Sequence, residues 1–258
     1  MSTQQIEWTA RDIECARSLL DGPAEAGRLL PALTDEEIVA LDGVERSQLV
    51  PLPFLDRNDG DKRLMATVAL RGLLAKQIAY PTVQEGQTTP DGLGAIDEIT
   101  GILTLRRTGQ RIVSGERRSA AGVHWLFGYV HGGRVLEEQI SDAGVHAFEV
   151  YPVQELADRL ALLVDPQSAA GADGAVDVVP EARFEALAPE IFGDSLAVTT
   201  VVAGGTDPGS QAALTVYASA DRVRTLDAAA PRDGADYTIT EVSADTLRGR
   251  LARELVGG

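Results

Sequence analysis

The chain has 258 residues, of which 24% are charged and 44% hydrophobic, a mix that suits one large or two small globular domains. A net charge of −16 argues against nucleic-acid binding, which requires a basic face. Cys15 is the single cysteine, so no disulfide can form within the chain. The first residues lack the basic and apolar segments of a signal peptide, and no apolar run is long enough to span a membrane. We therefore expect a cytoplasmic protein that binds neither nucleic acid nor membrane.

Two capped helices are predicted near the N-terminus. The range Trp8–Leu20 has an amphipathic spacing, with Thr9 placed to cap it and Asp12 three residues on. Thr34–Leu41 also begins at a threonine, with Glu37 at the capping-box position, and the following Asp-Gly pair ends it.

The next segments are predicted from proline positions and apolar spacing. Pro51–Leu55 is expected to be extended, because each proline disfavours helix at the preceding residue. A helix is predicted over Asp61–Pro81, and Thr82–Thr89 reads as a polar loop. Apolar residues then recur at three- and four-residue spacing over Pro90–Arg107, which favours another helix, although the isoleucine and threonine content leaves a strand open.

The strongest pattern in the sequence is an internal repeat. The range Gly122–Val164 reads as three strands and a helix, and Gln211–Val256 repeats that order. Further strands, Gly109–Arg118 and Ser195–Gly204, precede the two copies, and a helix is predicted before each of them. The matched positions are Trp125 with Leu214, Arg134 with Arg222, Phe148 with Tyr237, Val150 with Ile239, Leu156 with Leu247 and Leu160 with Leu251.

This repeat predicts an α+β fold of two pseudo-twofold-related halves. Each half is expected to be a four-stranded antiparallel sheet with flanking helices, since the connections between strands are short enough only for hairpins. The predicted halves are 1–166 and 181–258, joined by a small, polar linker over 167–180 in one compact unit. The pattern does not decide whether the halves share one sheet, and it leaves the oligomeric state open.

Histidines and acidic pairs offer no recognisable site. His124, His131 and His146 lack the spacing of a metal motif, so we interpret them as structural or surface residues. The second half has no counterpart to any of them. The pair Glu137-Glu138 is interpreted as a solvated face.

The sequence also contains no complete motif for catalysis or for cofactor binding. Gly193–Ala197 departs from the nucleophile elbow at its last position, and Cys15 lies beside an acidic residue, a poor setting for a thiolate. The Asp56–Asp61 stretch lacks the glycine and glutamate of a calcium loop. No phosphate-binding glycine loop is present either. We therefore predict no catalytic, cofactor-binding or metal-binding residues, and a protein that is not an enzyme.

The stretch Val123–Val164, with its strand, glycine turn, strand, strand and apolar helix, resembles the EspG-like type VII (ESX) secretion-associated proteins of actinobacteria. The helix over Leu64–Tyr80, the acidic composition and the excess of arginine over lysine also suit that family. The resemblance implies a cytosolic chaperone that binds the hydrophobic tip of a helical secretion substrate, without catalysis.

Candidate contacts for such a partner are chosen from the residues themselves rather than carried over from the family. They lie in an expected hairpin loop, Ser114–Gly122, and on the C-terminal helix, although both could instead be an ordinary turn and core. The candidate residues are Ser114, Arg117, Arg118, Leu247 and Leu251.

Two alternatives from other classes stay open. A small-molecule enzyme of unknown type would need a deep pocket lined by polar groups. A winged-helix regulator would use Asp61–Gln77 as its recognition helix, within an acidic chain.

Overall fold

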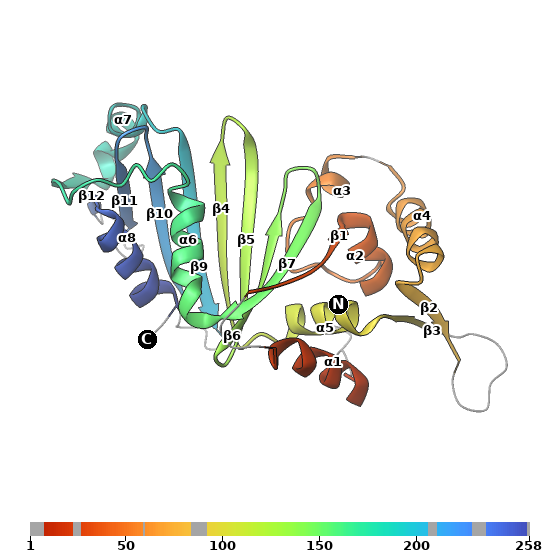
Figure 1. The fold of residues 1–258 in the computed structure, drawn as a ribbon. Coiled ribbons are helices and arrows are strands. Elements are labelled where there is room, and N and C mark those ends of the chain that lie inside the picture. The colour runs from red at the N-terminus through yellow and green to blue at the C-terminus, as the bar shows by residue number, and fades with distance from the viewer. Residues whose placement is uncertain are drawn as a thin grey trace. The chain divides into compact units, whose positions relative to one another are not determined.

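The computed structural model describes residues 8–22, 27–58, 60–83, 92–205, 211–228 and 236–256. Contacts group the chain into two compact units (Figure 1). Unit 1 comprises Met1–Gly109 and Arg134–Pro152, and unit 2 comprises Gln110–Gly133 and Val153–Gly258. The predicted halves, 1–166 and 181–258, are consecutive in the sequence and stay a prediction. The two units, in contrast, each combine separate segments of the chain.

The first helices of unit 1 begin and end within two residues of the predicted positions. The helix α1 (Ala10–Leu20) has Thr9 as its cap, with both bonds of the capping box to Asp12. The helix α2 (Asp35–Asp42) has the same box between Thr34 and Glu37. It ends at Gly43, whose φ of 105° favours glycine.

Three predicted spans in unit 1 need correction. The segment predicted to be extended at Pro51–Leu55 contains a short helix, α3 (Pro53–Arg57), because proline suits the first helical position. The next predicted helix is shorter, α4 (Lys62–Ala75), and the chain then forms a strand, β2 (Ala79–Thr82).

The helix predicted over Pro90–Arg107 is the strand β3 (Gly92–Ala95) followed by the helix α5 (Asp97–Thr108). The strands β2 and β3 pair with each other, a contact that local spacing does not reveal. Most of the predicted loop Thr82–Thr89 lies outside the described residues.

A three-stranded antiparallel arrangement supports these helices. The strand β7 (Val145–Pro152) pairs on one side with β6 (Arg134–Ile140) and on the other with β1 (Arg28–Thr34), a strand that the sequence did not indicate. In the same unit, α1 packs closely on α5 at Gly101, where a Cβ atom would lie 2.7 Å from Leu19.

Unit 2 is built on one antiparallel sheet, in which neighbouring strands pair in the order β5, β4, β9, β10, β11, β12, β8. Ser119 of β4 pairs with Ala197 of β9, and Arg111 with Gly205. The bounds are β4 (Arg111–Ser119), β5 (Gly122–His131), β8 (Val176–Pro180), β9 (Ala197–Gly205), β10 (Ala212–Ala218), β11 (Val223–Ala228) and β12 (Asp236–Glu241).

The repeat predicts four strands in each half and leaves open whether the halves share one sheet, and the pairing shows that they do. The strands β4 and β9, which the repeat matches, pair directly with each other, so the sheet runs across the boundary between the halves. The segment predicted as a linker over 167–180 also contributes the edge strand β8. The order of elements does recur in both halves: a helix, four strands and a helix.

Helices cover the unit 2 sheet. The helix α6 (Leu156–Val164), which follows a short 3₁₀ turn (Val153–Glu155), lies over β4, β9 and β10 (Figure 1). The helix α8 (Ala244–Arg250) continues into a π-helical segment, η2 (Leu251–Val256), which contacts β9, β10 and α6. A further helix, α7 (Glu181–Phe192), contacts β8 and β12. The core beneath α6 and η2 contains Leu160, Leu163, Val201, Leu214, Val216, Leu251 and Leu255.

Candidate functional site

The hairpin residues predicted to bind a partner lie within strand β4 rather than in a loop. The strand extends to Ser119, so the predicted loop Ser114–Gly122 is mostly β-structure. Ser114 and Arg118 share one face, whereas Arg117 alternates to the other, since side chains along a strand point to opposite faces. The strand therefore divides the three candidates between two surfaces.

The candidate leucines of the C-terminal helix lie in the core. Leu247 is 1% exposed and Leu251 is 0% exposed. The spacing that made them candidates is the spacing that turns both residues towards the sheet. Their side chains contact the interior, so a partner would meet other residues of this helix first.

A groove between α6 and α8 offers an exposed apolar residue instead. Its volume is about 410 Å³, and Leu247 forms part of its wall. Leu156, Leu160 and Leu163 face inward from α6, which leaves Leu162 on the outer side with 64% exposure. The groove is lined by Asp158, Ala161, Leu162, Asp165, Ser168, Ala244, Leu247 and Arg248.

Charged residues form the rim of this groove. Arg248 pairs with Asp158 at 2.5 Å and with Asp245 at 3.2 Å, which ties α8 to α6. Asp165 ends α6, and its two carboxylate oxygens accept the N–H groups of Ala169 and Ala170 at 2.8 and 2.9 Å. These charged groups of the groove are thus bonded within the chain itself.

A second cavity of about 200 Å³ adjoins the groove, because Asp165 lines both. It includes Arg117 of β4 and Leu196, which is 51% exposed. We define the α6 surface as the two hollows together, represented by Arg117, Asp158, Leu162, Asp165, Leu196 and Arg248. One of the sequence-based candidates, Arg117, therefore lies on it, with Leu247 beneath.

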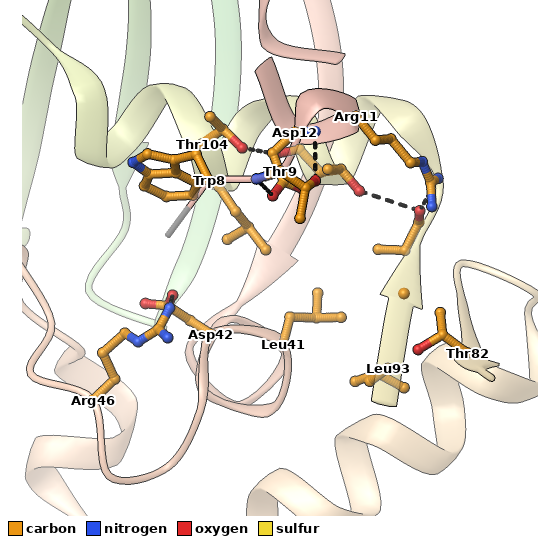
Figure 2. Close-up of a pocket in the computed structure, with 14 residues that line it drawn as sticks. Trp8, Thr9, Arg11, Asp12, Leu41, Asp42, Arg46, Thr82, Leu93 and Thr104 are labelled. Carbon is orange, nitrogen blue, oxygen red and sulfur yellow. Dashed lines mark hydrogen bonds and ion pairs between the residues drawn. The ribbon is translucent and has the colours of Figure 1, made fainter. Parts of the chain in front are cut away.

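Unit 1 contains a separate cavity of about 340 Å³ (Figure 2). Its polar wall is already bonded within the chain. Arg11 donates to the carbonyl of Ala95 at 3.0 Å, and Arg46 pairs with Asp42 at 3.0 Å. Burial alone would raise the pKa of Asp42, but the hydrogen bond and charge of Arg107 outweigh burial and hold that pKa below its ordinary value. This wall stabilises the fold around α1 and α2.

A cluster of buried charged side chains lies elsewhere in unit 1. Both ring nitrogens of His146 contact carboxylates: Nδ1 lies 2.6 Å from Glu138 Oε1, and Nε2 lies 2.7 Å from Asp35 Oδ1. Arg106 Nε donates to the other oxygen of Glu138 at 2.9 Å. None of these four residues is more than 3% exposed.

The buried cluster corrects the interpretation of Glu137-Glu138 as a solvated face. Both residues are buried, at 1% and 0% exposure, because the two faces of β6 are covered. Glu137 accepts hydrogen bonds from Tyr151 Oη and Gln139 Nε2, each at 2.6 Å. Sequence spacing gave no sign of these partners, which come from other strand positions and from α5.

Attraction between opposite charges sets the protonation of the cluster. For His146, burial alone would lower the pKa, but hydrogen bonds to Asp35 and Glu138 outweigh burial and raise it. For Glu138, burial alone would raise the pKa, but the charge of Arg106 and the hydrogen bond from His146 lower it. The arrangement stabilises an imidazolium between two carboxylates.

The remaining sequence-based candidates stay apart. His124 lies on β5 in unit 2, and Cys15 is buried on α1. In the part of the chain that the structure describes, no three His, Cys, Asp or Glu residues are grouped to hold a metal ion. Within the same residues, no helix is long and apolar enough to cross a membrane.

Comparison with known proteins gives a likeness of fold. No protein-family model and no curated protein matches the sequence. The type VII secretion system chaperone EspG5 of Mycobacterium tuberculosis, in a structure with the PE25–PPE41 dimer, aligns with a TM-score of 0.52 at 10% identity. The alignment covers 87% of this chain and 94% of that chain. At this identity the likeness concerns architecture, and this chain accordingly has an EspG-like fold.

Proposed function

We propose that this chain is a non-catalytic, cytoplasmic chaperone that binds a helical substrate protein of type VII secretion. The observation that carries the proposal is the EspG-like fold, which extends over 87% of the chain. One solved structure with that fold is a chaperone in complex with the PE25–PPE41 dimer. The proposal therefore assigns to this chain a protein partner rather than a small substrate.

The α6 surface is proposed as the docking site for that partner. A helix of a substrate protein would insert an apolar side chain beside Leu162, over the groove that Leu247 lines. Exposed apolar side chains surrounded by polar groups are typical of surfaces that bind helices. Leu162 and Leu196, at 64% and 51% exposure, would both lose contact with water on binding.

The charges on this surface favour a partner helix that carries basic residues. The exposed Asp158 is on the rim, and Arg248 lies between it and Asp245. The chain as a whole carries a net charge of −16. A helix with basic residues beside its apolar residue would therefore associate faster than an acidic one, and high salt would slow it.

Co-purification tests the proposal. The tagged chain should capture a PE–PPE-type dimer co-expressed with it, as a stoichiometric complex that survives gel filtration. Leu162→Asp should weaken capture at least about tenfold, because it places a charge where apolar contact is needed. Leu64→Asp is the matched control, since Leu64 is 61% exposed on α4 in unit 1.

The outcome can contradict either part of the proposal. If the wild-type chain captures no PE–PPE-type dimer from a broad panel, the chaperone assignment fails. If the dimer is captured and both variants bind as the wild type does, the chaperone role stands and the α6 surface is the wrong site.

A further inference from the structure

We propose that His146 is a buried imidazolium that latches helix α3 to strands β6 and β7, and that loss of its proton releases α3. The latch is a device of unit 1 and does not rest on the proposed chaperone function. It is carried by four charged side chains that are 0–3% exposed and joined by hydrogen bonds of 2.6–2.9 Å.

The geometry requires a proton on each ring nitrogen. A neutral imidazole has one N–H donor and one lone pair, whereas the imidazolium has two donors. Glu138 and Asp35 each place a carboxylate oxygen within 2.7 Å of a ring nitrogen. If the ring were neutral, one carboxylate would face a lone pair in a site without water contact. That arrangement is costly, so the charged ring is favoured.

The charges balance when His146 is protonated. Asp35 on α2 and Glu138 on β6 supply two negative charges, and Arg106 on α5 supplies the second positive charge. Strand β1 places the apolar Leu33 opposite His146, and β6 places Ile140 there. The cluster of these four residues is therefore neutral with the imidazolium and carries one net negative charge without it.

Asp35 connects the histidine to α3. Its second oxygen, Oδ2, accepts the N–H groups of Phe54 and Leu55 at 2.7 and 3.1 Å. The N-cap residue of α3 makes no side-chain bond of its own, so Asp35 caps this helix from a distance. If Asp35 moves away from a neutral His146, the first N–H groups of α3 lose their acceptor.

The turn between β6 and β7 is shaped to allow this contact. Gly144 has a φ of 75°, and a Cβ atom there would lie 2.9 Å from the Asp35 carboxyl group and 2.5 Å from Phe54. The carbonyl of Gly144 also accepts the backbone N–H of Asp35 at 3.0 Å. Glycine thus permits the close approach of the turn, α2 and α3.

The sign of the pH dependence follows from the two shifts. The raised pKa of His146 contributes stability that is complete in mild acid and is lost as pH rises through the folded-state value. The lowered pKa of Glu138 contributes stability that is lost only as pH falls through its own folded-state value. The latch is therefore closed near neutrality and opens on the alkaline side.

Nuclear magnetic resonance on the full chain tests the latch. At about pH 7, where an ordinary histidine is mostly neutral, both ring nitrogens of His146 should show imidazolium shifts. A His124→Gln variant should leave this signal unchanged. Amide exchange at Phe54 and Leu55, corrected for intrinsic base catalysis, should accelerate about tenfold per pH unit as the deprotonated fraction grows. Ile102 of α5 serves as the internal reference.

A His146→Gln variant separates a latch from a passive core residue. It should show weak protection of Phe54 and Leu55 at every pH, because the titrating group is gone. A neutral ring tautomer of His146 at about pH 7 in the wild type would overturn the proposal, whether or not the variant folds. So would protection of α3 that stays constant on the alkaline side.

Discussion

The two units bury their helices on strands by different means. In unit 2, α6 and η2 cover the sheet with leucines, and Leu160, Val201 and Val216 are all 0% exposed. In unit 1, the space between α2, α5 and β7 also contains Asp35 and His146 at 0% exposure. An apolar core gains stability in proportion to its buried area and tolerates change. A charged core is stable only while every partner is present, so it specifies its neighbours more strictly.

The largest expected effect comes from removing one partner of the charged core. Arg106→Met should lower the free energy of unfolding by about 3–5 kcal/mol, because it leaves the buried carboxylate of Glu138 without its cation. Arg118→Met is the control: Arg118 pairs with Glu116 on the exposed face of β4, and such pairs contribute about 0–1 kcal/mol. Urea denaturation at neutral pH measures both. Equal losses would remove the distinction between the units.

The next effect is the apolar counterpart in unit 2. Leu160→Ala should cost about 2–5 kcal/mol, since the side chain is fully buried and leaves a cavity over the sheet. Leu162→Ala on the same helix should change stability by no more than about 0.5 kcal/mol, because that side chain is exposed. The same denaturation experiment compares them. A large loss of stability from Leu162→Ala would mean that Leu162 packs in the core and is not available to a partner.

The smallest effects are those of two helix caps, one in each unit. Thr34 accepts the N–H of Glu37 at 3.3 Å, and Ser243 accepts the N–H of Thr246 at 3.2 Å. Replacing either residue by alanine should cost about 1 kcal/mol. Thr34 is next to Asp35, so a cost for Thr34→Ala well above that for Ser243→Ala would show that the buried charges amplify a local defect. Thermal unfolding of the two variants decides this.

Local features of the fold were predictable, and contacts between distant segments were not. The capping boxes at Thr9 and Thr34 were confirmed, because each bond joins residues three positions apart. The strands β2 and β3 were predicted as helix, since their short apolar runs fit either period until they pair. The direct pairing of β4 with β9 likewise depends on partners that no local pattern contains.

The residues of the buried cluster are also far apart in the sequence, so local patterns could not reveal their contacts. Arg106 and Glu138 are 32 positions apart, and His146 and Asp35 are 111 apart. In the sequence, Glu138 stands beside Glu137, and such an acidic pair is typical of a solvent-exposed face. The sequence-based candidates Leu247 and Leu251 are inward residues of the C-terminal helix, because leucines at core spacing are the conspicuous ones. Leu162 falls outside that spacing, and for that reason it is exposed.

The most direct test of the proposed chaperone role is a calorimetric titration of the chain with a purified PE–PPE-type dimer. We predict one-to-one binding, with affinity reduced at least about tenfold by Leu162→Asp and unchanged by Leu64→Asp. Hydrogen exchange in the complex should slow at the amides of α6 and α8. Absence of binding by the folded wild-type chain to every such dimer tested would contradict the account.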